Sequence, residues 1–183
     1  MKILVTGAYG QLGSELKVLS EKVSNHQFIF TDIDSLDIAD EKQVAHFFAA
    51  QQPGFVLNCA AYTAVDKAET DSKAARKINI DAPGFLAKAA ARSKSGFIHI
   101  STDYVFDGNS FKPYSEEDMV NPAGVYGKTK YEGELRCFDE NPESVIIRTS
   151  WLYSSFGNNF VKTMLRLGRD RDLLKVVLDK WGS

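Results

Sequence analysis

Short apolar runs alternate along the chain with longer segments in which apolar residues recur three and four positions apart. The short runs predict β-strands and the longer segments predict amphipathic helices. The expected strands are Lys2–Thr6, Gln27–Thr31, Phe55–Cys59, Gly96–Ser101, Ser144–Arg148 and Leu174–Leu178. The expected helices are Gln11–Glu21, a helix capped by Asp40 and ending near Gln52, Ser72–Arg92, Gly124–Phe138 and Asn159–Leu167.

The regular alternation of strands and helices predicts an α/β fold. We expect a Rossmann-like, doubly wound parallel sheet flanked by helices on both faces, because each crossover between parallel strands is right-handed. The run Phe55-Val56-Leu57 lacks polar alternation, as strands buried on both faces do. Residues Asp103–Asn121 are polar, contain Gly and Pro, and predict a long loop. We interpret residues 1–183 as one dinucleotide-binding domain.

Composition narrows the class of protein. The 22 Lys and Arg residues against 24 Asp and Glu residues give a formal net charge of −2, which disfavours nucleic-acid binding. The apolar runs are too short to span a membrane. Two cysteines, Cys59 and Cys137, are too few for a disulfide framework, and we interpret both as buried, inert thiols. This cysteine content fits a reducing cytoplasm, which is the location that we expect. His26, His46 and His99 are too scattered to predict a metal site.

A glycine-rich turn lies between the first strand and the first helix. Gly7, Gly10 and Gly13 follow a GxxGxxG spacing, which suits a tight turn, a close approach of backbone to pyrophosphate and close helix–sheet packing. The N–H groups of the helix N-terminus would receive the phosphates. Its position between a strand and an amphipathic helix makes this glycine triplet a predicted dinucleotide site.

Asp32 ends the second strand, 19 residues after Gly13. A carboxylate there can accept hydrogen bonds from the adenosine ribose and would repel a 2′-phosphate, which favours NADH over NADPH. The alternative is that Asp32 only starts a turn with Asp34. Asp37 and Ile38 could lie near the adenine ring.

Ala61, Tyr62 and Thr63 follow the third strand, at the edge of the sheet where cofactors bind in open α/β folds. Small residues there would let a dinucleotide pass close to the backbone. The sequence alone leaves the assignment of this segment, and that of the adenine contacts, open.

A candidate catalytic set follows the fourth strand. Tyr126 and Lys130 are four residues apart and should share a helix face. The ammonium would stabilise phenolate and lower the phenol pKa, which would ease proton transfer, and it could also bind the nicotinamide ribose. Thr102 closes the fourth strand and could donate to a substrate carbonyl oxygen. A chance Tyr-x-x-x-Lys pair and a simple turn at Thr102 are the alternatives.

Several blocks together closely resemble the dTDP-4-dehydrorhamnose reductase family of the extended short-chain dehydrogenase/reductases. The resemblance covers essentially the whole chain, and its most specific blocks are Ser-Thr-Asp-Tyr-Val-Phe at 101–106 and Arg-Thr-Ser-Trp at 148–151. The other blocks are the glycine triplet, Asn58–Asp66, Tyr126–Lys130 and Gly157–Phe160 with Met164–Leu167.

The resemblance implies that a nicotinamide hydride, from NADH or NADPH, reduces the C4 ketone of dTDP-6-deoxy-L-lyxo-4-hexulose (dTDP-4-dehydro-L-rhamnose). The product would be dTDP-L-rhamnose for cell-surface polysaccharide synthesis. It implies a catalytic triad of Thr102, Tyr126 and Lys130, with Tyr126 as the proton donor. By matched position, the cofactor would contact Gln11, Leu12, Asp32, Asp37, Ile38, Ala61, Tyr62 and Thr63, and the sugar nucleotide would contact Thr102, Asp103 and Trp151.

Members of the family continue into a small lobe that completes the sugar-nucleotide pocket, and that lobe is missing here, so we expect this chain to be a fragment. A homodimer stays open, and metal contacts that use the missing lobe are not transferred. Asp103 is followed by Tyr104, not by the Glu typical of dehydratases, which favours simple reduction. The alternatives are a non-catalytic dinucleotide-binding regulatory subunit and another nucleotide-sugar reductase or epimerase.

Overall fold

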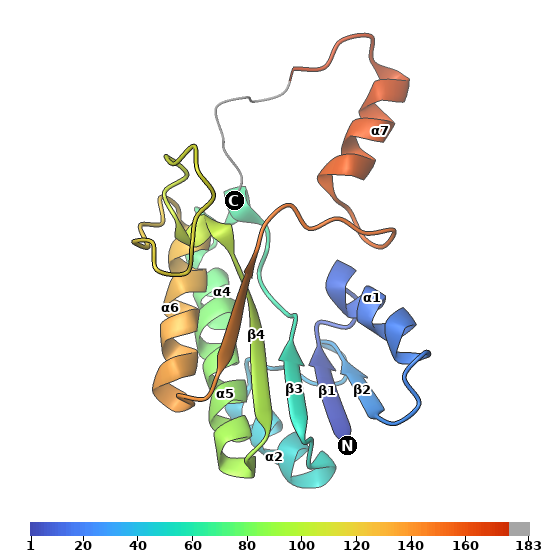
Figure 1. Ribbon diagram of the computed structural model, residues 1–183, viewed down its shortest axis with the longest axis vertical. Coiled ribbons are helices and arrows are strands. Elements are labelled where there is room, and N and C mark those ends of the chain that lie inside the picture. Colours follow the sequence, from blue (N-terminus) through green and yellow to red (C-terminus); the bar gives the residue numbers. More distant parts are fainter. Residues whose placement is uncertain (176–183) are drawn as a thin grey trace.

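A single parallel β-sheet organises the molecule. The computed structural model describes residues 1–175 and contains five strands in the order β2-β1-β3-β4-β5, each pair parallel (Figure 1). The strands are β1 (Lys2–Thr6), β2 (Gln27–Thr31), β3 (Phe55–Asn58), β4 (Gly96–Thr102) and β5 (Val145–Thr149). The strand order reverses direction between β1 and β3, which opens a crevice at the carboxyl ends of these strands. The predicted doubly wound α/β fold is confirmed.

Helices connect the strands and cover the sheet, except α7 (Phe160–Asp170), which follows β5 and extends away from the sheet (Figure 1). The others are α1 (Gln11–Ser20), α2 (Glu41–Gln51), α3 (Val65–Ala68), α4 (Ser72–Arg76), the π-helix η1 (Lys77–Asp81), α5 (Ala82–Ser93), the 3-10 helix η2 (Asp103–Val105) and α6 (Val125–Glu140). The chain steps one way in the sheet through α1 and the other way through α2, α5 and α6. Right-handed crossovers therefore place α1 on the opposite face from those three helices.

The core lies between the sheet and the layer formed by α2 and α5. Leu4 of β1, Val56 of β3 and Phe97 of β4 are buried against Phe48 of α2 and Leu86 of α5. Each such side chain contributes about 1.5–3 kcal/mol when it leaves water. This packing fixes the central strands, so the loops at their carboxyl ends start from a rigid platform.

The predicted helix Ser72–Arg92 is interrupted. The π-helix η1 separates α4 from α5, and Asn79 at its centre is almost fully buried. The Asn79 side chain forms two hydrogen bonds with the backbone of Tyr62 and one with Thr129 Oγ1. A π-turn contains one residue more than an α-helical turn. We attribute this extra residue to the tertiary hydrogen bonds, because the wider turn points the Asn79 side chain toward Tyr62 and Thr129.

Other predicted boundaries also shift. The third strand ends at Asn58 rather than Cys59, and the expected loop Asp103–Asn121 begins with η2. The short helix α3 had no counterpart in the sequence prediction. The expected strand Leu174–Leu178 runs beyond the described residues, and its first two residues are not in a strand.

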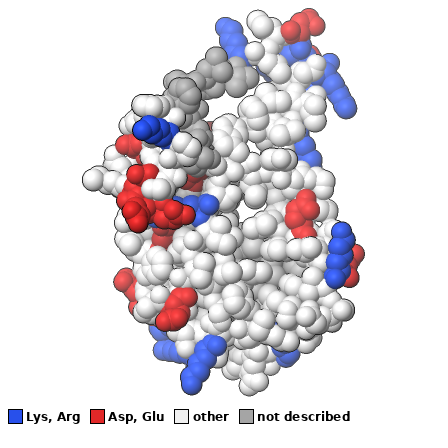
Figure 2. Space-filling view, viewed as in Figure 1, with Lys and Arg blue, Asp and Glu red and all other residues white. Residues whose placement is uncertain are grey.

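The surface of the described part carries charges of both signs. Lys and Arg side chains are dispersed over the face that Figure 2 shows. Within residues 1–175, no helix combines the length and apolar character needed to cross a bilayer. In the same residues, no cluster of three or more His, Cys, Asp or Glu side chains is arranged to hold a metal ion.

Candidate active site

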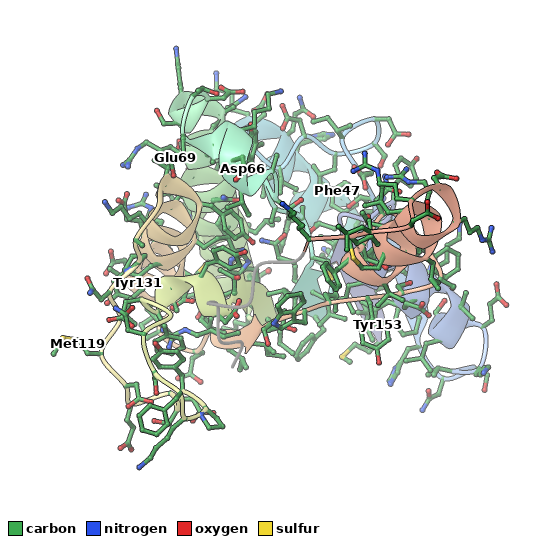
Figure 3. All side chains as sticks on the ribbon, turned by 90° about the horizontal axis from the view of Figure 1, so that it is seen from above. Phe47, Asp66, Glu69, Met119, Tyr131 and Tyr153 are labelled. Atoms are coloured by element: carbon green, nitrogen blue, oxygen red, sulfur yellow. The ribbon has the colours of Figure 1, made fainter. Side chains whose placement is uncertain are left out.

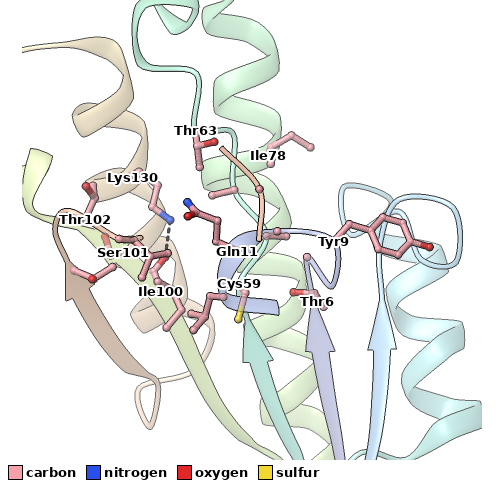
Figure 4. A pocket seen from close by; sticks show the side chains of 18 of the residues that line it. Thr6, Tyr9, Gln11, Cys59, Thr63, Ile78, Ile100, Ser101, Thr102 and Lys130 are labelled. Carbon is pink, nitrogen blue, oxygen red and sulfur yellow. Dashed lines mark hydrogen bonds between the residues drawn. The ribbon is translucent and has the colours of Figure 1, made fainter. Parts of the chain in front are cut away.

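A cavity of about 680 Å³ opens at the carboxyl edge of the sheet (Figure 4). It is bordered by segments that follow all five strands. Most of the site residues expected from the sequence line it, namely Gly7, Gly10, Gln11, Leu12, Asp32, Asp37, Ile38, Ala61, Thr63, Thr102, Asp103, Tyr126, Lys130 and Trp151. Gly13 and Tyr62 are not among its lining residues. The structure thus brings the expected cofactor, catalytic and substrate residues together at one cavity.

Close backbone contacts leave no space for a side chain at Gly7, in the loop after β1, or at Gly13, in the first turn of α1. Gly7 has a φ of +70°, and a Cβ atom there would lie 2.7 Å from the backbone nitrogen of Ala60. A Cβ atom on Gly13 would lie 2.3 Å from the carbonyl oxygen of Gly7, so Gly13 serves close packing behind the cavity. Gly10 is the N-cap of α1. The N-terminus of α1, with unpaired N–H groups and a partial positive charge, therefore borders the cavity.

Asp32 is held in a defined orientation at the end of β2. Its carboxylate accepts hydrogen bonds from the backbone N–H groups of Tyr9 and Ile33, each at 2.9 Å. Its carbonyl oxygen also accepts from the N–H groups of Ser35 and Leu36, so Asp32 starts a turn as well. The turn was the alternative explanation for this residue, and the structure shows that a turn and a cavity-lining carboxylate coexist.

The three expected catalytic residues are all buried. Thr102 is the last residue of β4, Tyr126 lies in the first turn of α6, and Lys130 lies one turn further on. The carboxylate of Glu69 accepts a hydrogen bond from the N–H of Val125 at 2.8 Å and so fixes the start of α6 (Figure 3).

Gly127 allows α6 to approach η2 closely. A Cβ atom at Gly127 would lie 2.1 Å from the carbonyl oxygen of Tyr104. The ring of Tyr104 also packs edge-on against that of Tyr126, with centroids 5.4 Å apart. This contact draws the first turn of α6 toward the end of β4 and sets the phenol of Tyr126 near Thr102.

Burial controls the electrostatics of this set. It raises the pKa of Tyr126 above its ordinary value, while the interaction with the Thr102 hydroxyl opposes the rise and the charge of Asp103 adds to it. Burial also lowers the pKa of Lys130 to about 8. The expectation that Lys130 lowers the phenol pKa is therefore wrong for the site as it stands. The reason is that burial of the phenol disfavours the phenolate, and Lys130 Nζ donates its hydrogen bond to the carbonyl oxygen of Ile100 at 2.7 Å.

The two further substrate-contact candidates differ in their surroundings. Asp103 accepts a hydrogen bond from Thr102 Oγ1 at 3.2 Å, and burial raises the pKa of its carboxyl group. Trp151 is 58% exposed, adopts a left-handed backbone with a φ of +51°, and packs edge-on against Phe160. Trp151 therefore offers an open aromatic face at the rim of the cavity.

A buried hydrogen-bonded chain crosses the three central strands beneath the cavity. Thr6 Oγ1 donates to Asn58 Oδ1 at 2.7 Å, Asn58 Nδ2 lies 2.9 Å from His99 Nδ1, and His99 Nε2 lies 3.2 Å from Lys130 Nζ. The sequence analysis considered His99 only as a possible metal ligand and did not identify these contacts. The available signal was a polar side chain inside each of three strongly apolar strands, because buried polar groups need partners.

A second buried network fixes the end of β4. The carboxylate of Glu134 accepts hydrogen bonds from Ser101 Oγ and from two nitrogens of Arg148, at 3.1 and 2.7 Å. The guanidinium of Arg148 also lies 5.1 Å from the centre of the Phe106 ring. These contacts tie α6 to β4 and β5, so they hold Thr102 and Lys130 at a fixed separation. The sequence analysis did not identify this role for Glu134.

The loop after β5 reaches back to α1. Asn159 Nδ2 donates to Gln11 Oε1 at 3.0 Å, and Ser154 Oγ donates to Glu15 Oε1 at 2.5 Å. Gly157 lies against the side chain of Gln11 and also lines the cavity. The loop therefore closes one side of the cavity next to the N-terminus of α1.

The two cysteines are consistent with inert thiols. Burial raises the pKa of both Cys59 and Cys137 to about 12. Cys59 nevertheless lines the cavity, where it contributes apolar surface.

Comparison with known proteins places this geometry in a family. The family model described as "RmlD substrate binding domain" matches residues 1–183. The dTDP-4-dehydrorhamnose reductase of Aggregatibacter actinomycetemcomitans is 44% identical over the whole chain, which covers 62% of that relative. The structure of a dTDP-4-dehydrorhamnose reductase from Clostridium acetobutylicum is 51% identical, with a TM-score of 0.93 over 97% of this chain and 62% of its own.

A second solved structure carries a ligand in its description. The dTDP-4-dehydrorhamnose reductase of Bacillus anthracis, in complex with NADP, is 38% identical, with a TM-score of 0.88 over 93% of this chain and 60% of its own. This chain thus spans about three fifths of the length of these relatives. The match over its entire length nonetheless shows that the chain belongs to the RmlD substrate-binding-domain family.

Proposed function

We propose that this chain forms the dinucleotide-binding and catalytic part of a dTDP-4-dehydrorhamnose reductase. The reaction is the reduction of the C4 ketone of dTDP-4-dehydro-L-rhamnose to dTDP-L-rhamnose. One observation carries the proposal: Thr102, Tyr126 and Lys130 line the same cavity as the glycine-rich N-terminus of α1. The names of the relatives support the choice of substrate.

The residues at this cavity suit a nicotinamide dinucleotide. The backbone at Gly7 leaves no space for a Cβ atom, so a pyrophosphate could approach the main chain there, next to the N-terminus of α1. The carboxylate of Asp32 suits a ribose that carries two free hydroxyl groups. No Lys or Arg lies between Asp32 and Glu41 to receive a 2′-phosphate, so we propose NADH as the preferred donor. Titration of the intact protein with NADH and NADPH would decide this, since tighter binding of NADPH would contradict it.

The bound dinucleotide supplies the hydride that reduces the ketone carbon. Tyr126 donates the phenol proton to the ketone oxygen as negative charge develops on it. Burial raises the pKa of Tyr126, which keeps the phenol protonated and ready to donate near neutral pH. Thr102 donates a hydrogen bond to the same oxygen and so stabilises its developing charge. Lys130 orients the cofactor ribose from the next turn of α6.

The test is the loss of NADH absorbance in the presence of the ketosugar, measured on the intact protein. The variant Tyr126→Phe removes only the phenol hydroxyl, and we expect its kcat to fall by about 10²–10⁴-fold. Tyr131→Phe on the same helix is the matched control, because Tyr131 does not line the cavity, and its rate should match wild type.

Two outcomes would reject the proposal. Equal rates for wild type and Tyr126→Phe would show that the phenol is not the proton donor. Tight dinucleotide binding without any turnover by the wild type would instead indicate a regulatory binding subunit. An epimerase would interconvert a sugar without net consumption of NADH.

A further inference from the structure

The buried His99 has both ring nitrogens engaged, and the partners on its two sides determine which nitrogen carries the proton. His99 in β4 is fully buried, with Nδ1 facing the side-chain amide of Asn58 and Nε2 facing Lys130 Nζ. Burial lowers the pKa of His99 well below its ordinary value, so the ring is neutral. A neutral imidazole carries one donor and one acceptor nitrogen.

The orientation of the Asn58 amide is fixed by its other partners. Asn58 Oδ1 lies 2.7 Å from Thr6 Oγ1 and 3.2 Å from the backbone nitrogen of Ala60. The N–H of Ala60 can only donate, so the amide atom that it faces must be the oxygen. The NH₂ group of Asn58 then points at His99 Nδ1, and this nitrogen must be the acceptor.

The single proton of His99 consequently lies on Nε2 and points toward Lys130. Lys130 Nζ is 3.2 Å from this nitrogen and donates to the carbonyl oxygen of Ile100 at 2.7 Å. An ammonium group has no lone pair and cannot accept a hydrogen bond, whereas an uncharged amine can. The contact is therefore satisfied only when Lys130 is an amine.

The other titratable groups near Lys130 do not prevent Lys130 from being an uncharged amine. Glu134 lies on the same helix and favours the ammonium, but its carboxylate is already bonded to Arg148 and Ser101. Cys137, also on α6, has a pKa raised to about 12 and is an uncharged thiol near neutral pH. Burial of Lys130, at 1% exposure, further favours the amine.

We propose that His99 is a positioning residue that stabilises the uncharged amine of Lys130 at mildly alkaline pH before the dinucleotide binds. Binding then converts Lys130 to an ammonium by uptake of one proton from solvent. The driving force is the negative pyrophosphate and the ribose hydroxyl groups, which give Lys130 new acceptors in the cavity and release it from His99. The inference rests on the proposed dinucleotide site, but it concerns the state of the protein before binding as well.

The tautomer of His99 is the first test. Long-range ¹H–¹⁵N correlation spectra of the intact, dinucleotide-free protein distinguish Nε2–H from Nδ1–H imidazoles. We expect the Nε2–H form for His99. An Nδ1–H form would overturn the proposal, and this measurement needs no variant that might fold poorly.

Proton uptake on cofactor binding is the second test. Calorimetric titration with NADH in buffers of different ionisation enthalpy gives the number of protons taken up. With a Lys130 pKa of about 8, about three quarters of the molecules carry the amine at pH 8.5 and about none at pH 6. We expect an uptake near 0.75 proton per dinucleotide at pH 8.5, as an order-of-magnitude value, and close to none at pH 6.

Three variants identify the groups involved. Lys130→Met defines the background uptake from all other residues. His99→Gln places an amide oxygen where it can accept from an ammonium, so its uptake at pH 8.5 should fall to that background. His46→Gln, at an exposed position on α2, should behave as wild type.

The outcomes separate this inference from the proposed reaction. Uptake as expected together with no reduction of the ketosugar would reject the reaction and leave the role of His99 intact. If no dinucleotide binds, the cofactor site is rejected, and the imidazole spectrum alone decides the resting state of Lys130. Wild-type uptake equal to that of Lys130→Met, or unchanged in His99→Gln, would overturn the proposal.

Discussion

The ion pair between Glu134 and Arg148 should be a main determinant of stability, and Glu134→Leu tests this. The carboxylate of Glu134 has only 3% of its side chain exposed, and its partner Arg148 has 23%. Removing one member of a buried pair costs about 3–5 kcal/mol. Because Arg148 keeps some access to water, we expect about 3 kcal/mol, with about 1 kcal/mol more from the unpaired Ser101 hydroxyl. Leucine has a similar volume, so a cavity contributes little.

The assay is urea unfolding of the intact protein, followed by circular dichroism. Glu132→Leu on the same helix is the control, since its pair with Arg76 is 42% and 56% exposed and should contribute about 0–1 kcal/mol. Adding Arg148→Met to Glu134→Leu should recover about 1–2 kcal/mol, because no buried charge is then left unpaired. Equal losses for Glu134→Leu and Glu132→Leu would refute the reasoning.

Three further predictions address the cavity. Gly7→Ala forces a left-handed φ on a residue with a side chain and a contact of 2.7 Å to Ala60 N, so we expect a loss of about 2–5 kcal/mol in unfolding free energy and weaker NADH binding. The folded state binds fewer protons on Lys130 than the unfolded chain does between about pH 8 and the ordinary lysine pKa of 10.5. Stability relative to Lys130→Met should therefore rise by about 2 kcal/mol from about pH 7.5 to about pH 9.5, and a fall would contradict the buried amine. Asp32→Ser should shift the ratio of NADH to NADPH affinity toward NADPH by about tenfold, and an unchanged ratio would remove Asp32 from the ribose site.

The strands were the most predictable part of the fold. The sequence predicted β1 and β2 with the bounds that the structure has, because both are short apolar runs between polar turns, although only β1 is buried along most of its length. The interruption at Lys77–Asp81 could not be predicted from periodicity. It depends on the hydrogen bonds that Asn79 shares with Tyr62 and Thr129, which are distant in sequence and meet Asn79 only in the folded chain.

Site residues were predictable where both the residue type and its position on a strand or helix indicated the same role. Tyr126 and Lys130 share a helix face by spacing alone, and Thr102 lies at a strand end, so their meeting at one edge of the sheet follows from the topology. The protonation behaviour was not predictable in the same way. The pKa directions of Tyr126 and Lys130 follow from burial, which depends on how α6 packs against the sheet.

The π-turn at Lys77–Asp81 makes this stretch sensitive to a change in length. In an α-helix each residue turns the chain by about 100°, and the π-turn accommodates one residue more than this spacing allows while Ala75 on one side and Leu86 on the other stay fully buried. Deletion of one residue from the turn would restore regular α-helical spacing and leave both flanking segments in place, but it would disturb the hydrogen bonds of the buried Asn79. We therefore expect a one-residue deletion here to lower stability without changing the fold, whereas insertion of a further residue would rotate the flanking segments against each other.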